Sequence, residues 1–512
     1  MVKIFDTVFF FKKIIFLTFL FFLPFILFLN KNNLPQLEFE EVRIIFFSQL
    51  FFLSFIIIFS LLIYKLLRIK YYKNINFKSF LTIIFILHYF SFFYNEKFTS
   101  NLQNIIFEGF YFSAFIFLII LIFFFLILLN IFNISLKVKN FLSFFVTIFL
   151  IFNYFIFVYD FVNYFKIINY SKNDDKSNLI KDQNFISNKI ESMDIYFVIL
   201  DGMMSLNNAE ALGILTEKKI LQDLKNIGGI ISSDSITNYN TTHLSLTSIF
   251  ELDYFIKDGK NQYYDMNKVF PKILNNNNTP LLKILKDINR DFYWVGNEWA
   301  YCKEKENINC LFQNNTKIYI SLNKFYKNNP LIHFINYTKD YLLNKKNYYL
   351  DSLDLFFDTS ESLDAINLNL SNNDKFFFIH LYKPHGPYIF DSDCNILKNE
   401  NKDKLQGYSN NYNCVLSGIP NFVNKINEKT DKKNIFFFIG DHGWFNYQKE
   451  VFNLIISGSC NLDKTLPKSN INVVRFALNC SDNLRLKFLE DRYYNSKYTY
   501  EDNGIFGNFI QN

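Results

Sequence analysis

The sequence predicts an N-terminal all-α transmembrane bundle of about five helices, followed by an α/β domain with a central, mostly parallel sheet flanked by helices. Long apolar runs are confined to the first 170 of the 512 residues, whereas the rest of the chain contains short apolar runs that end in aspartate or histidine. We expect a transmembrane domain over residues 1–165, a polar linker over 166–193 and an exported domain over 194–512.

The membrane half is predicted from the length and the charges of its apolar runs. A bilayer-spanning helix needs about 20 apolar residues, and three of the five runs reach that length. Ten Lys and Arg residues lie at the N-terminus and in alternate loops, against three in the other loops, so the N-terminus is expected to be cytoplasmic. An odd number of spans then exports everything after the last run. The five runs are 14–29, 44–64, 80–94, 109–132 and 141–159.

Composition excludes several classes of protein. The chain has 67 Phe and 32 Tyr but only 15 Gly and 9 Pro, which excludes collagen-like, proline-rich and low-complexity chains. The net charge is only +6, and its basic residues cluster beside the apolar runs. We therefore expect a membrane as partner and no nucleic acid.

The cysteines support export of the second half. All six follow residue 300, and an even set in an exported domain is typical of disulfides. Free thiols or a metal cluster are the alternative, but the absence of C-x-x-C spacing disfavours zinc binding by cysteine. The simplest pairing joins neighbours in the sequence: Cys302–Cys310, Cys394–Cys414 and Cys460–Cys480.

Three predicted strands end in residues that bind metals. The continuous apolar runs 194–200, 375–379 and 434–439 are typical of strands covered on both faces by helices. Ligands bind beyond the carboxyl ends of such strands, where Asp201, His380 with His385, and the pair Asp441 and His442 follow. Carboxylate oxygens and an imidazole nitrogen suit Zn²⁺ or Mn²⁺. Glycines on both sides of the Asp-His pair are interpreted as leaving room for a metal and a phosphate.

A fourth segment, 235–250, predicts a helix whose first turn contains Thr241, Thr242 and His243. The free N–H groups and positive end of a helix would stabilise an attacking alkoxide and an anionic phospho-adduct at a hydroxyl there. Simple capping by Thr241 or Thr242 is the alternative.

Together these segments resemble the sulfatase-like branch of the alkaline phosphatase superfamily, which includes lipoteichoic acid synthases and lipid A phosphoethanolamine transferases. The resemblance covers roughly 194–450, with its parts in family order. It implies an alkaline-phosphatase/sulfatase-like α/β fold and one divalent metal ion, Zn or Mn, with Mg or Ca as alternatives. It also implies that the nucleophile is Thr242, that Asp201, Thr242, Asp441 and His442 hold the metal, and that His380 and His385 serve the transferred or leaving group.

Two departures narrow the expected chemistry. The first expected ligand is an aspartate, Asp201, as in sulfatases and phosphatases. The lipid-phosphate transferases usually have Glu at this position. No Cys-x-Pro-x-Arg or Ser-x-Pro-x-Arg segment is present, so a threonine nucleophile favours phosphoryl-group chemistry over sulfate-ester hydrolysis. Thr242 is preferred to Thr241 as that nucleophile.

The expected protein is a transferase anchored in the inner (plasma) membrane by several spans, with its catalytic domain on the periplasmic side. It would move a phosphoryl-linked group, such as a phospholipid headgroup, through a threonine-bound intermediate onto an envelope glycan, lipid or polymer. A hydrolase of the same fold, acting on phosphodiesters or sulfuric esters, is the nearest alternative. A non-catalytic membrane protein that binds an envelope glycan is an alternative of another class.

Overall fold

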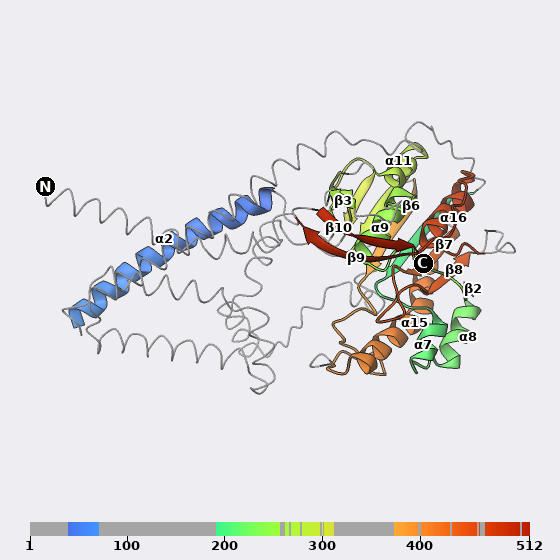
Figure 1. The fold of residues 1–512 in the computed structure, drawn as a ribbon, viewed down its shortest axis with the longest axis horizontal. Helices are drawn as coiled ribbons and strands as arrows, with labels where there is room; N and C mark the ends of the chain where they lie inside the picture. Colours follow the sequence, from blue (N-terminus) through green and yellow to red (C-terminus); the bar gives the residue numbers. More distant parts are fainter. Residues whose placement is uncertain are drawn as a thin grey trace. The chain divides into compact units, whose positions relative to one another are not determined.

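The computed structural model describes two separate units of the chain (Figure 1). Helix α2 (Phe39–Lys70) belongs to the first unit, and all the described residues from 191 onward belong to the second. The described residues are 39–70, 191–255, 262–265, 268–276, 279–296, 300, 302–311, 373–397, 401–430, 433–457, 460, 466–501 and 504–511.

Helix α2 contains the second predicted apolar run, 44–64, so that run is helical. Two of its serines bond back to the preceding turn, with Ser48 Oγ donating to the Ile45 carbonyl at 2.7 Å and Ser54 Oγ donating to the Leu50 carbonyl at 3.0 Å. Among the described residues, no helix combines the length and the apolar character that a bilayer-spanning segment needs. The other four predicted runs lie outside the described residues, and the domain boundaries stay predictions.

The second unit is built on a seven-stranded, mostly parallel sheet, as predicted. Its order is β2-β8-β7-β1-β6-β4-β5, and the five strands from β7 to β5 are parallel, whereas β8 is antiparallel to β7 and β2 is antiparallel to β8. The strands are β1 (Met193–Leu200), β2 (Gly229–Ile231), β4 (Arg290–Val295), β5 (Ile308–Leu311), β6 (Asp374–Leu381), β7 (Lys433–Gly440) and β8 (Asn453–Ser457).

Helices cover both faces of this sheet (Figure 1). All eight residues of β1 are buried, and they alternate between two cores, which explains why the strand reads as a continuous apolar run. Tyr196, Val198 and Leu200 belong to a core that also contains residues of α15 (Lys404–Lys429) and α8 (Lys218–Asn226). The short helix α7 (Leu206–Ala211), which comes before α8 in the chain, contributes Ala209 to the same core. The opposite face packs with α9 (Thr242–Glu251), α11 (Pro280–Asp287) and α16 (Asn470–Asp482), near the short α10 (Ile273–Asn276).

A smaller antiparallel sheet was not predicted. It has the order β3-β10-β9, formed by β3 (Gln262–Asp265), β9 (Tyr494–Glu501) and β10 (Gly504–Gln511). Its strand β9 has the sequence YNSKYTYE, which contains no aliphatic residue and so carries no apolar run typical of a strand.

A buried arginine ties together the amino ends of the parallel strands. Arg290, at the start of β4, is 1% exposed and donates through Nη1 to the carbonyls of Met193 and Lys375, at 2.7 and 3.0 Å. Its Nη2 lies 3.0 Å from Asp482 Oδ2, at the end of α16. One guanidinium therefore joins three strands and a helix at the edge opposite the carboxyl ends.

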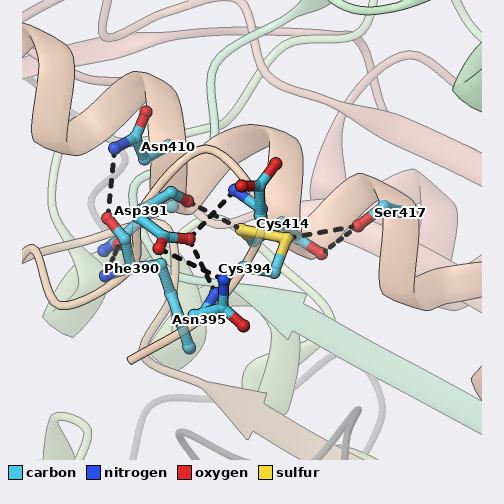
Figure 2. The surroundings of a disulfide bond; sticks show 9 residues. Phe390, Asp391, Cys394, Asn395, Asn410, Cys414 and Ser417 are labelled. Atoms are coloured by element: carbon cyan, nitrogen blue, oxygen red, sulfur yellow. Dashed lines mark hydrogen bonds between the residues drawn. A yellow bond between two sulfur atoms is a disulfide. The ribbon is translucent and has the colours of Figure 1, made fainter. Parts of the chain in front are cut away.

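All three predicted disulfides are present, and the described residues contain no free cysteine. The Cα atoms of Cys394 and Cys414 are 5.3 Å apart, within the usual range for disulfides. Figure 2 shows this bridge joining the loop after β6 to α15, with the Asp391 carboxylate accepting hydrogen bonds from Asn395 in the same loop. Asn410 of α15 adds a hydrogen bond from Nδ2 to the Phe390 carbonyl, at 3.1 Å.

Candidate active site

The register of the three central strands brings the predicted residues to one edge of the sheet. Leu200 at the end of β1 is level with Leu381 of β6 and with Gly440 of β7. Asp201 and Asp441 therefore follow their strands side by side. One ligand atom each from Asp201, Asp441 and His442 lies within 4.8 Å of the other two, which is the spacing of a metal-binding cluster.

His442 is held with one ring nitrogen aimed at this cluster. Its Nδ1 lies 2.6 Å from the Gly443 carbonyl, and because a carbonyl only accepts, Nδ1 carries the proton. In the neutral ring Nε2 then has a free lone pair, 3.7 Å from Asp201 Oδ1 and 3.7 Å from Asp441 Oδ2. Burial lowers the pKa of His442, but the two carboxylates and the Gly443 carbonyl outweigh burial and raise it above the usual value.

The carboxylates of Asp201 and Asp441 are buried, and one oxygen of each lacks a hydrogen bond. Asp441 Oδ1 accepts from the backbone N–H groups of Gly202 and His442, both at 2.9 Å. Asp441 Oδ2 and Asp201 Oδ1 are buried without any hydrogen-bond partner, although such oxygens are rarely left unpaired in native proteins. Two orphaned carboxylate oxygens and an imidazole lone pair facing one another fit a divalent cation such as Zn²⁺.

The pKa values of the two carboxyl groups are displaced in opposite directions. Burial raises the pKa of Asp201, but the hydrogen bond from His380 and the charges of His380, His442 and His385 lower it below its usual value. Burial raises the pKa of Asp441, and the negative charge of Asp201 raises it further. A bound cation would remove this conflict by neutralising both carboxylates.

Thr242 presents its hydroxyl to the same cluster. It is the first residue of α9, is 8% exposed, and its Oγ1 lies 3.1 Å from His442 Nε2. Thr241 is the N-cap residue, yet its side chain makes no capping hydrogen bond, so the capping alternative describes neither threonine. The hydroxyl therefore stands at the positive end of a ten-residue helix beside the carboxylates.

Three other histidines among the described residues occupy different environments. His380 lies inside β6, one residue beyond the predicted strand end, and is fully buried, with Nε2 3.4 Å from Asp201 Oδ2. His385 is exposed, and its Nδ1 lies 2.9 Å from the Gly386 carbonyl. His243 follows Thr242 in the first turn of α9, and burial lowers its pKa to about 4.

The glycines around the Asp-His pair make room for backbone, which corrects the interpretation given above. A Cβ on Gly440 would lie 2.1 Å from the Met203 carbonyl oxygen, and one on Gly443 would lie 1.8 Å from that of Tyr447. Gly202 is the glycine beside the ligand atoms: it has φ +71°, and a Cβ there would contact His385 and His442 at 3.7 Å. Glycine at position 202 is therefore favoured by its positive φ.

The segment before α9 is held by residues far along the chain. Asn238 Oδ1 accepts from the backbone N–H of Ile471 at 3.0 Å, and its Nδ2 donates to the Arg492 carbonyl at 3.1 Å. The ring of Tyr239 stacks on that of Tyr494, with centroids 5.6 Å apart. The start of β9 therefore fixes the approach to Thr242.

Sequence reasoning missed the residues of α15 that support the site from the opposite face of the sheet. Tyr408, fully buried, donates from its hydroxyl to the Gly202 carbonyl at 2.8 Å and stacks on Trp444. Asn411 is also fully buried, and its Nδ2 lies within 3.3 to 3.5 Å of three carbonyls in the loop that carries His385. Nothing in the sequence distinguishes these residues from ordinary helix residues, because their partners are about 20 to 200 positions away.

Comparisons with known proteins identify a family for this chain. The sulfatase family model matches residues 194–459. Comparison with curated proteins gives no significant match. Solved structures of similar fold include the C-terminal periplasmic domain of phosphoethanolamine transferase EptC from Campylobacter jejuni, at 14% identity, covering 56% of this chain and 88% of that one with a TM-score of 0.33.

Two further structures show a likeness of the same degree. The soluble domain of lipooligosaccharide phosphoethanolamine transferase A from Neisseria meningitidis is 13% identical, with 58% of this chain and 90% of that one covered and a TM-score of 0.39. The C-terminal periplasmic domain of EptC from Escherichia coli, in complex with Zn, is 11% identical, with coverage of 63% and 95% and a TM-score of 0.39. Because the family model spans more than half of the 512 residues, the chain belongs to the sulfatase family and is a sulfatase-like hydrolase or transferase.

Proposed function

We propose that the protein is a metal-dependent transferase that moves a phosphoryl-linked group through a covalent intermediate on Thr242. The proposal rests on one observation above all: the Thr242 hydroxyl lies 3.1 Å from His442 Nε2, beside the orphaned oxygens of Asp201 and Asp441. Asp201, Asp441, His442 and Thr242 would hold one divalent cation, Zn²⁺ or Mn²⁺ by their donor atoms. Bound there, the cation would supply positive charge that favours ionisation of a hydroxyl and offsets the charge of a phosphate.

In the first step the Thr242 hydroxyl gives up its proton to solvent and its oxygen attacks the phosphorus of a phosphodiester, and a proton returns to Oγ1 when the second step releases it. A bond forms between Oγ1 and phosphorus, and the bond from phosphorus to the leaving oxygen breaks. The backbone N–H groups of the first turn of α9 point toward the phosphate oxygens and stabilise their negative charge. In the second step an acceptor hydroxyl attacks the same phosphorus, and the bond to Oγ1 breaks, which regenerates the free threonine.

His385 is the proposed acid for the leaving oxygen. It is exposed beside Gly202, and the Gly386 carbonyl accepts from its Nδ1, so a proton on Nε2 faces the solvent side of the site. An imidazolium there can protonate the departing alkoxide and then take a proton from the incoming hydroxyl. His380 is fully buried behind Asp201, so its proposed contribution is a hydrogen bond that orients this carboxylate.

The proposed donor is a phospholipid headgroup, and the proposed acceptor is an envelope glycan, lipid or polymer. The apolar runs before residue 165 and the excess of Lys and Arg in alternate loops support a membrane anchor with the catalytic domain on the periplasmic side. The three disulfides support an oxidising compartment. A site held near a bilayer would meet lipid donors at high local concentration.

The experiment compares Thr242→Ala with Thr241→Ala in the full chain, using phosphatidylethanolamine in mixed micelles with zinc. Wild type and Thr241→Ala should release diacylglycerol and carry the headgroup phosphate on the peptide containing Thr242, detected by mass spectrometry. Thr242→Ala should release none while binding zinc nearly as tightly as wild type, because a hydroxyl is a minor ligand.

Two outcomes would contradict the proposal. Full turnover by Thr242→Ala that a chelator still abolishes would indicate a hydrolase that uses water as its nucleophile. No turnover and no zinc binding by wild type would favour a non-catalytic glycan-binding protein, and glycan binding that persists in the presence of a chelator would then identify it.

A further inference from the structure

Tyr408 connects two of the segments that carry the candidate metal ligands. Its hydroxyl donates to the Gly202 carbonyl at 2.8 Å and accepts from the Met204 backbone N–H at 3.3 Å. Its ring stacks on Trp444, with centroids 4.3 Å apart and planes 12° apart. Gly202 follows Asp201 and Trp444 comes two residues after His442, so one side chain contacts the turns after β1 and β7.

The hydrogen bonds continue from Tyr408 to the carboxylates. Gly202 receives the Tyr408 hydroxyl at its carbonyl and donates its own N–H to Asp441 Oδ1 at 2.9 Å. Among the described residues, no other group donates to the Gly202 carbonyl. Gly202 thus lies between the phenol on one face of the sheet and Asp441 at its edge.

Backbone hydrogen bonds hold the residues on either side of Gly202, with the Asp201 N–H donating to the Leu381 carbonyl at 3.0 Å and the Met203 carbonyl accepting from Phe452 at 3.1 Å, and Tyr408 adds the bond to the Gly202 carbonyl itself. Gly202 has no side chain and a φ of +71°, so it adds no packing of its own. Asp201 and Asp441 repel each other at short range, and a fixed backbone helps to keep their oxygens converging before a cation arrives. Burial raises the pKa of Tyr408 well above its usual value, so the phenol stays neutral and keeps its proton to donate.

We propose that Tyr408 is a positioning residue that fixes the separation of Asp201 and Asp441 for the divalent cation. The inference rests on the proposed metal site and concerns affinity for the ion. Tyr408 makes its hydrogen bonds and its ring stack with Gly202, Met204 and Trp444, so it acts on the candidate ligands through the backbone and side chains of these turns. Trp444 in turn donates from Nε1 to the Tyr388 hydroxyl at 3.0 Å, which extends the same support to the loop that carries His385.

Helix α15 offers a matched control one turn further on. Tyr412 is also fully buried, and its hydroxyl donates to the Met204 carbonyl at 3.1 Å. Tyr412→Phe therefore removes one buried hydroxyl from the same face of the same helix. It leaves untouched the hydrogen bond to Gly202, the stack on Trp444 and the turn after Asp201.

The experiment measures zinc dissociation constants of wild type, Tyr408→Phe and Tyr412→Phe in the full chain, by competition with a chromophoric chelator. Tyr408→Phe should bind zinc on the order of 10- to 100-fold more weakly, which is the usual effect of losing a residue that orients ligands. Tyr412→Phe should stay within about threefold of wild type, because its partner lies outside the ligand turn. In chelator, the midpoint temperature of thermal unfolding should fall by a similar amount in both variants. A difference in zinc affinity between them then reflects the positioning of the ligands and not a difference in stability.

Equal zinc affinity of Tyr408→Phe and wild type would overturn the inference while leaving the proposed function intact. Absence of zinc binding by wild type itself would overturn the proposed function, and the inference with it. If Tyr408→Phe fails to fold, Trp444→Leu tests the same support by removing the stacked ring and leaving Tyr408 in place. Weakened zinc binding by that variant supports the inference, and wild-type affinity contradicts it.

Discussion

Replacing Asp441 by Asn should stabilise the metal-free protein and abolish its stabilisation by zinc. The ligand oxygens of Asp201 and Asp441 lie within 4.8 Å of each other. At an effective dielectric constant of about 20, two unit charges at that distance repel by about 3.5 kcal/mol. Asn keeps the Oδ1 that accepts from Gly202 and His442, so the exchange removes the charge with little loss of hydrogen bonding.

The assay is chemical denaturation of the full chain in two conditions. In chelator at high pH, where deprotonation of His442 and of both carboxyl groups is favoured, the free energy of unfolding of Asp441→Asn should exceed that of wild type by up to about 3.5 kcal/mol. At neutral pH, with zinc about 1,000-fold above its dissociation constant, the free energy of unfolding of wild type should exceed its value in chelator by about 4.1 kcal/mol. That of the variant should hardly change.

Either of two results would refute this reasoning. A metal-free variant no more stable than wild type at high pH would mean that the two carboxylates do not share a desolvated site. Equal stabilisation of both proteins by zinc would mean that the ion binds elsewhere.

Two further predictions concern stability. Arg290→Met should lower the free energy of unfolding by about 3 to 5 kcal/mol, measured with urea, because it leaves the buried charge of Asp482 without its partner; an effect below about 1 kcal/mol would contradict this. Gly440→Ala should cost about 1 to 3 kcal/mol and weaken zinc binding, because its Cβ would meet the Met203 carbonyl oxygen at 2.1 Å and displace Asp441. If Gly440→Ala has the stability and the zinc affinity of wild type, the backbone accommodates the added methyl group without a loss of free energy, and the prediction is wrong.

The strand ends were predictable from the sequence because their cause is local. A strand buried on both faces must be apolar throughout, so the first charged residue after it marks the carboxyl end. Parallel neighbours then bring such residues together, as Asp201 and Asp441 show. The three disulfides followed for a similar reason, since each joins cysteines 8 or 20 positions apart.

The remaining features depend on contacts between distant segments. His380 reads as the residue after a strand, yet β6 continues through Leu381, and pairing with Ile199 of β1 carries the imidazole into the core behind Asp201. Tyr408 reads as one more aromatic residue of a helix, and its role depends on a carbonyl 206 positions away. Local patterns contain no information about such distances.

The contacts between the segment before Thr242 and the start of β9 set the order of events during synthesis. Asn238 and Tyr239 acquire their full set of partners only when the chain has been made as far as Tyr494, although Asn238 also bonds to Tyr254 and Ile471. At roughly 5 to 20 residues per second, the interval between the appearance of Asp201 and that of Tyr494 lasts on the order of 15 to 60 seconds. Only in the last part of that interval, after His442 has been made, does a nascent chain contain all four residues of the candidate metal site while it still lacks Tyr494. The segment before the nucleophile therefore acquires its full support only when β9 is made, and a ribosome stalled just before that point would hold a chain with every candidate ligand but without these contacts.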